Sequence, residues 1–162
     1  MNLAPRLSLL GWTSESTARI RGFNPTFKSH VDRIIRRLYD HLLARPESAR
    51  LLVGKDVHGT LAPAQREHWL RLFRCEFDDD YVRDALRIGQ VHYRQQVPPY
   101  IYMAAYNYFL TSTLAVSVEA VRGLDLPYLL TDISRLVSLD LELSLSSYVR
   151  QHWGDEDTVL VT

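Results

Sequence analysis

Apolar residues recur at the three- and four-residue spacing of an α-helix along nearly the whole of this 162-residue chain. The prolines and glycines fall mostly between these periodic segments, where they act as helix boundaries. The sequence shows no run of alternating strands joined by hairpin turns. Its length fits one hydrophobic core, so the chain is predicted to form a single all-α domain.

Caps and helix breakers predict where the helices begin and end. Asn24 is a favourable N-cap and Pro25 suits the first helical position, so a long helix is expected to begin there. Pro46 should end that helix, and Thr60 is expected to cap a later one. The other helices are expected over residues 4–22 (one or two short helices), 46–53, 61–73, 79–94, 99–121 and 127–152.

The last two predicted helices are longer than most. Each would contain about 23 to 26 residues and span roughly 35 to 39 Å at 1.5 Å per residue, against a typical length of about 11 to 12 residues. Helices of this length offer enough surface for the internal core and for a partner at once. The tail, residues 154–162, is predicted to be frayed or to begin a linker.

The charge and cysteine content exclude several classes of protein. Lys plus Arg and Asp plus Glu both number 19, which argues against a broad basic face for nucleic acid or a membrane surface. No apolar run reaches the roughly 18 to 20 residues that span a bilayer, and no signal-peptide pattern is visible. The single cysteine, Cys75, excludes an internal disulfide, so a cytoplasmic location is expected.

The most informative candidate for a functional site is His92, which lies near the end of a predicted helix and ahead of the aromatic run Pro98 to Tyr108. A single histidine on a partly apolar helix face is more often a packed core residue than a ligand. No cysteine or carboxylate stands one turn away, which argues against an ordinary metal site. Haem iron needs only one proximal imidazole, because the porphyrin supplies four nitrogens. The residues alone leave both interpretations open.

Five motifs occur in an order and spacing typical of one family. They are Leu38-Tyr39-x-x-Leu42-Leu43, Leu61-x-x-x-Gln65-Arg66-x-His68-Trp69, Phe77-Asp78-Asp79-x-Tyr81-Val82, Arg87-Ile88-Gly89-x-Val91-His92 and Val97-Pro98-Pro99-x-x-Tyr102-x-x-Ala105-Tyr106. From about residue 24 to 150 the chain resembles the globin-coupled sensors. The resemblance implies a globin-like sensor domain over residues 1–153, with haem b as cofactor. Its ligand would be oxygen, or another diatomic gas such as carbon monoxide or nitric oxide.

The same resemblance implies roles for five residues. His92 would be the proximal ligand of the iron, with Ile88 one turn earlier against the porphyrin. Tyr39 would donate a hydrogen bond to the bound gas, and Leu61 would cover the same distal face. Tyr102 would lie beside the proximal imidazole and relay its movement. Tyr39 and Leu61 each retain a plainer interpretation as core residues.

Four further positions bear on the site. His58 and His68 are alternatives for a sixth iron ligand in the gas-free state. The family often has tryptophan where this chain has Ile101, which would alter how proximal movement reaches the last helices. It often has glycine where this chain has Ala104, which is expected to tighten packing near the pocket.

The resemblance also implies how such a domain would work. It would form a homodimer through its last two helices and signal to an output module such as a diguanylate cyclase, a histidine kinase or a chemotaxis transducer. No catalytic site is expected, because the chain shows no nucleophile–base pair and no phosphate-binding loop. The alternatives are a haem-free globin-like interaction module and an oxygen-reactive haem enzyme such as a dioxygenase.

Overall fold

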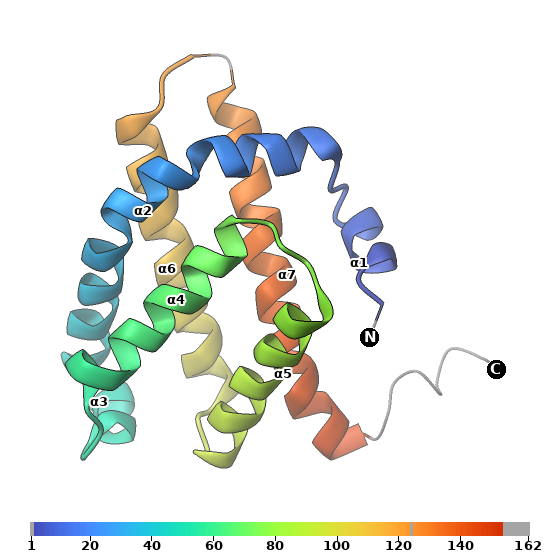
Figure 1. Cartoon of the computed structure of the whole chain (residues 1–162). Coiled ribbons are helices and arrows are strands. Elements are labelled where there is room, and N and C mark those ends of the chain that lie inside the picture. Colours follow the sequence, from blue (N-terminus) through green and yellow to red (C-terminus); the bar gives the residue numbers. More distant parts are fainter. Residues whose placement is uncertain (1, 124, 154–162) are drawn as a thin grey trace.

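The structure, a computed structural model, describes residues 2–123 and 125–153, and over these residues all regular secondary structure is helical (Figure 1). The elements are α1 (Ala4–Leu9), α2 (Ser14–Leu43), α3 (Pro46–Leu52), the π-helical turn η1 (Val57–Leu61), α4 (Ala62–Phe73), α5 (Asp79–Arg94), α6 (Pro99–Ala120) and α7 (Leu126–Trp153). The prediction of an all-α fold is confirmed. The predicted frayed tail, residues 154–162, lies outside the described residues.

The helix α2 is continuous over 30 residues, so the predicted helix start at Asn24 and Pro25 is wrong. It begins at Ser14, where Thr13 and Ser16 form a reciprocal capping box. Figure 1 shows α2 changing direction partway along its length, and Pro25 lies inside it. The same face is buried on both sides of the proline, at Ile20, Phe23, Phe27 and Val31. This continuous burial offsets the backbone hydrogen bond that the proline removes.

The segment before α4 also differs from the prediction. The expected N-cap Thr60 lies inside η1, where its hydroxyl donates to Asp56 at 3.1 Å. The carboxylate of Asp56 caps the turn, since it also accepts the backbone N–H of Gly59 at 2.9 Å. A carboxylate is a favourable acceptor at the positive end of a helical segment. The π-helical turn then runs directly into α4, which places Leu61 at their junction.

The later helices begin and end close to their predicted bounds. The Asp78 carboxylate accepts the backbone N–H of Tyr81 at 2.8 Å and so caps α5. The two long helices are confirmed, with 22 residues in α6 and 28 in α7. None of the helices within residues 2–123 and 125–153 combines the length and hydropathy needed to cross a lipid bilayer.

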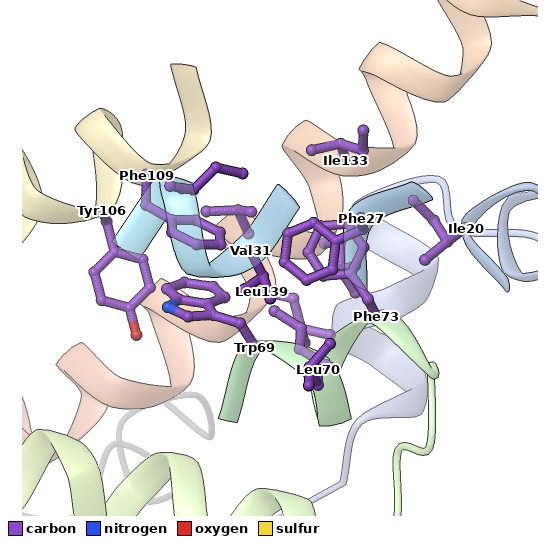
Figure 2. Close-up of a cluster of buried hydrophobic side chains, with 14 of the residues drawn as sticks. Ile20, Phe27, Val31, Trp69, Leu70, Phe73, Tyr106, Phe109, Ile133 and Leu139 are labelled. Atoms are coloured by element: carbon purple, nitrogen blue, oxygen red, sulfur yellow. The ribbon is translucent and has the colours of Figure 1, made fainter. Parts of the chain in front are cut away.

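Stacked aromatic rings hold α2, α4 and α6 together in the core (Figure 2). The rings of Phe27 and Phe73 are stacked with centroids 3.7 Å apart, and those of Trp69 and Phe109 are stacked at the same distance. Such pairs contribute about 0.5–1.5 kcal/mol each beyond the area that they bury. Tyr106 lies at one end of this cluster, beside Trp69. The cluster therefore holds the rings of Trp69 and Tyr106 in fixed positions relative to each other.

The helix α5, which carries His92, packs closely on α7. A Cβ atom at Gly89 would collide with the backbone carbonyl of Ser144, so only glycine permits this approach. One turn on, the Ser147 hydroxyl donates to the carbonyl of Leu86 at 2.8 Å. The helix α5 is therefore held against α7 at close backbone distance.

Candidate functional site

A cavity of about 250 Å³ lies between α2, α3, α4, α5 and α6. Small-molecule pockets typically measure about 300–1,000 Å³, so this cavity is slightly smaller than that range. All five residues singled out from the sequence line it: His92, Tyr39, Leu61, Ile88 and Tyr102. The remaining wall is mostly apolar: Leu38, Leu42, Ser48, Leu51, Leu52, Lys55, Ala64, Gln65, His68, Trp69, Val91, Gln95, Val97, Ile101, Ala105 and Tyr106. Residues from α2, α3, η1, α4, α5 and α6 thus meet around one space.

The imidazole of His92 is held in one orientation. Its Nδ1 lies 2.8 Å from the backbone carbonyl of Ile88, one turn earlier on α5, so Nδ1–H donates to that oxygen. This hydrogen bond fixes the tautomer in which Nε2 keeps its lone pair. Burial, and to a lesser extent the charge of Lys55, lower the pKa of His92. A neutral imidazole with a free Nε2 is the form that binds a metal ion.

Tyr39 and Leu61 face the same cavity from α2 and η1. Tyr39 is buried, and burial raises its pKa to about 12, so the hydroxyl stays protonated at neutral pH. No residue within 2–123 and 125–153 makes a hydrogen bond to this hydroxyl. Its oxygen is not among the fully enclosed polar atoms of the described chain, so it remains accessible at the cavity wall. Tyr39 is therefore a donor available to a ligand in the cavity.

The start of α6 forms the wall beside His92. The rings of Tyr102 and His92 lie 4.7 Å apart between centroids, at an angle of 56°. Ile101, which stands where tryptophan was expected, is buried and also lines the cavity. Ala104 is exposed and does not line it, so the expected tightening of the pocket at that position is wrong.

The two other histidines considered as ligands lie in different surroundings. His58 is exposed in η1 and does not line the cavity. His68 lines the cavity, but its Nε2 lies 2.8 Å from Oδ2 of Asp140, to which it donates a hydrogen bond. The described contacts therefore give His68 a partner within the protein.

Sequence reasoning missed two charged residues. Lys55 lines the cavity and makes no ion pair with another described residue. Asp140 is fully buried on α7. It is in helical phase with Ile133, Leu136 and Val137, which are all buried. A carboxylate in phase with these apolar residues is a signal that could have identified it.

The remaining reactive groups do not form a second site among the described residues. No cluster of three or more His, Cys, Asp or Glu side chains within them could hold a metal ion. Cys75 is buried, and burial raises its pKa to about 12. A thiol with so high a pKa is a poor nucleophile at neutral pH.

Comparisons with known proteins agree with this architecture. The family model described as Protoglobin matches residues 2–153. The heme-based aerotactic transducer HemAT of Halobacterium salinarum is 27% identical over 159 residues, which is 91% of this chain and 32% of that protein. The chain therefore spans about a third of the length of this relative.

A solved structure shares the fold. The globin domain of a Geobacter sulfurreducens globin-coupled sensor superposes with a TM-score of 0.85 at 19% sequence identity. The match covers 91% of this chain and 98% of that one. At this identity the likeness concerns the fold, and it confirms the predicted globin-like arrangement of helices.

Proposed function

Because the chain belongs to the Protoglobin family, we propose that residues 1–153 form a haem-based sensor of oxygen or another diatomic gas. One observation carries this proposal. The imidazole of His92 lines an apolar cavity in its neutral form, with Nδ1 held by the carbonyl of Ile88. The same cavity is lined by the Tyr39 hydroxyl, which has no partner in the described chain.

The residues around the cavity fit haem b. When bound, haem supplies an iron centre that takes one axial imidazole and leaves the other face to a diatomic gas. Nε2 of His92 would bind the iron, and Ile88 would lie against the porphyrin. Tyr39 would donate a hydrogen bond on the distal face, where the apolar side chain of Leu61 would keep water out.

Lys55 completes the fit because haem carries two carboxylates. Among the described residues that line the cavity, Lys55 is the one with a cationic ammonium group, and it is partly exposed. An ammonium forms charge-assisted hydrogen bonds with carboxylates. We assign Lys55 as the partner of a haem propionate at the mouth of the cavity.

We propose that the domain forms a homodimer through α6 and α7. The exposed face of α6 runs along the helix at spacings of three and four residues and carries no charge before Glu119. Its members are Tyr100, Met103, Ala104, Asn107, Thr111, Ala115 and Val118. Depletion of charged residues is typical of the centre of an interface. In such a dimer α6 and α7 would contact the same helices of the second copy.

The domain would pass its signal to an output module. HemAT, whose name describes an aerotactic transducer, is about three times as long as the part that this chain matches. This chain would correspond to the sensory part. A diguanylate cyclase, a histidine kinase or a chemotaxis transducer are the output modules that we expect.

A haem titration followed by absorption spectroscopy tests the function. We expect the purified protein to develop a Soret band that shifts when oxygen or carbon monoxide is added. His92→Ala should lose the iron–imidazole bond and the gas-dependent shift. His41→Ala is the matched control, because His41 lies on α2 and does not line the cavity. A wild-type protein that remains colourless with added haem would instead support a haem-free interaction module.

A further inference from the structure

A buried carboxylate lies where four helices meet. Asp140 of α7 has no exposed surface. Its oxygens accept hydrogen bonds from His68 of α4 at 2.8 Å, Tyr81 of α5 at 2.9 Å and Tyr106 of α6 at 2.8 Å. A buried charge is tolerated when such partners replace its lost hydration. Asp140 therefore joins α7 to each of the three other helices.

Asp140 and His68 form an ion pair. Burial acts to raise the pKa of Asp140, but the charge of His68 and the hydrogen bonds from His68, Tyr106 and Tyr81 outweigh burial and lower it. Burial acts to lower the pKa of His68, but the charge and hydrogen bond of Asp140 raise it overall. Both directions favour the charged forms. Asp140 is thus a fixed acceptor for the hydroxyl groups around it.

Tyr106 connects Asp140 to the proximal side of the cavity. Its hydroxyl donates to Asp140 and accepts from the hydroxyl of Tyr102 at an O–O distance of 3.4 Å. This second bond is the longest of the series and hence the weakest. The Tyr102 ring in turn packs on the imidazole of His92. An unbroken series of contacts therefore leads from α7 to the ligand of the proposed haem.

We propose that Asp140 is a positioning residue for His92, acting through Tyr106 and Tyr102 to fix the orientation of the imidazole. The inference rests on the proposed function, in which His92 binds the iron. Orientation matters because groups that hold a ligating histidine tune its bond to the metal. Since Asp140 belongs to α7, displacement of that helix and tilting of His92 would be coupled in both directions.

Tyr81 offers a matched control for Tyr106. It donates to Oδ1 of Asp140, whereas Tyr106 donates to Oδ2. Tyr81→Phe and Tyr106→Phe each remove one oxygen atom and one hydrogen bond to the same carboxylate from a buried ring. Tyr106→Phe also removes the hydrogen bonds of that hydroxyl with Tyr102 and Ser144, and the bond with Tyr102 leads on toward His92. A general loss of packing predicts equal effects of the two substitutions, whereas positioning predicts an effect on His92 from Tyr106→Phe alone.

The first measurement uses the haem-free protein. We expect the NMR signals of the His92 and Tyr102 rings to shift in Tyr106→Phe and in Asp140→Asn, and to stay in place in Tyr81→Phe. If Asp140→Asn does not fold, the comparison of Tyr106→Phe with Tyr81→Phe still tests the positioning role. Unmoved signals in Tyr106→Phe, or equal shifts in the two tyrosine variants, would overturn the inference.

The second measurement uses the haem-loaded ferrous protein and its iron–histidine stretching band in resonance Raman spectra. We expect the band in the wild type, shifted in Tyr106→Phe and Asp140→Asn and unshifted in Tyr81→Phe. A wild type without the band would contradict the proposed function, while the haem-free NMR comparison would still test the series of contacts. A normal band that stays unshifted in Tyr106→Phe would contradict the positioning role alone.

Discussion

Gly89 of α5 lies against the backbone carbonyl of Ser144 of α7, with no space for a β-carbon between them. The contact is three residues before His92 and on the same helix. The helices α5 and α7 therefore cannot separate or slide at this point without losing backbone contact. A displacement of α5 at Gly89 would therefore press directly on the backbone of α7.

Gly89→Ala should force α5 away from α7, because the obstacle is backbone and cannot rotate aside. We expect a loss of about 1–3 kcal/mol in the free energy of unfolding, as for other overpacked sites. Gly22→Ala is the control, since Gly22 lies in α2 with nothing within 4 Å of its added Cβ. It should stabilise the helix by about 0.5–1 kcal/mol. Denaturant titrations measure both, and equal effects would contradict the close contact.

Tyr39→Phe should speed the dissociation of oxygen. The variant removes a protonated hydroxyl that faces the cavity and leaves the ring in place. One hydrogen bond contributes about 1 kcal/mol net, which corresponds to roughly a fivefold change in rate. Stopped-flow replacement of oxygen by carbon monoxide measures it. Tyr108→Phe is the control because Tyr108 packs on His41 and does not line the cavity; an unchanged rate in Tyr39→Phe would remove the distal role.

Lys55→Met should weaken haem retention modestly. The ammonium group is partly exposed, so the lost interaction with a propionate is worth about 0.2–1 kcal/mol, or up to roughly a fivefold faster loss of haem. Transfer of haem to an acceptor protein measures this rate. Lys55→Arg should keep most of the effect. Lys28→Met, an exposed position on α2, should change nothing.

The His68–Asp140 pair should make stability depend on pH. The folded pKa of His68 is raised above 6.5. Its contribution to the free energy of unfolding is therefore complete below pH 6.5 and is lost as pH rises through the folded pKa. Asp140 has a folded pKa lowered below 3.8, so its contribution is present above 3.8 and is lost as pH falls through the folded pKa. Tyr81 and Tyr106 have pKa values well above 10.0, through burial and then Asp140, and stay protonated. The His68–Asp140 pair therefore stabilises the fold fully between pH 3.8 and pH 6.5.

Asp140→Ala tests this window. Removing one partner of a buried pair typically costs about 3–5 kcal/mol, and we expect the difference from the wild type to be largest between the two pKa limits and smaller at alkaline pH. Unfolding by denaturant at several pH values measures it. Asp32→Ala, at an exposed ion pair with Arg66, is the control and should show little effect. A difference that does not change with pH would contradict an ionised pair.

Thr111→Arg should separate the proposed dimer, because Thr111 is at the middle of the uncharged face of α6. Two arginines brought together across a two-fold interface would repel and lose hydration. Sedimentation velocity measures the change from dimer to monomer. Ser29→Arg, at an exposed position on α2, should leave the dimer intact. A dimer that survives Thr111→Arg would place the interface elsewhere.

The elements with strong local signals were predictable from the sequence. The starts of α5 and α6 were predicted closely, because Asp78 caps α5 and Pro99 begins α6 through the neighbouring backbone alone. The helix start predicted at Pro25 was wrong because it rested on the same kind of local signal. The local preference of Pro25 for a helix start was outweighed by the burial of Phe23 and Phe27 on either side, which depends on packing with distant residues.

Some residues of the candidate site were likewise predictable from the sequence, and others were not. Motif spacing singled out His92, Tyr39 and Tyr102, and the structure places all three around one cavity. The helical phase of Asp140 was a local signal that its carboxylate is buried. No local pattern says that this carboxylate will meet His68, which is remote in the chain. The roles of the cavity residues remain predictions until haem binding is measured.

The length of α2 has a mechanical consequence. Near its start, Ser16 and Arg19 donate hydrogen bonds to the buried Asp132 of α7, each at 2.8 Å. Near its end, Tyr39 faces the cavity. Measured along its bent axis, α2 runs about 30 Å from Arg19 to Tyr39 at 1.5 Å per residue. It therefore connects its anchor on α7 to the tyrosine that faces the cavity. A displacement of α7 at Asp132 would therefore be carried along α2 to the Tyr39 side of the cavity, by a route separate from the one through His92.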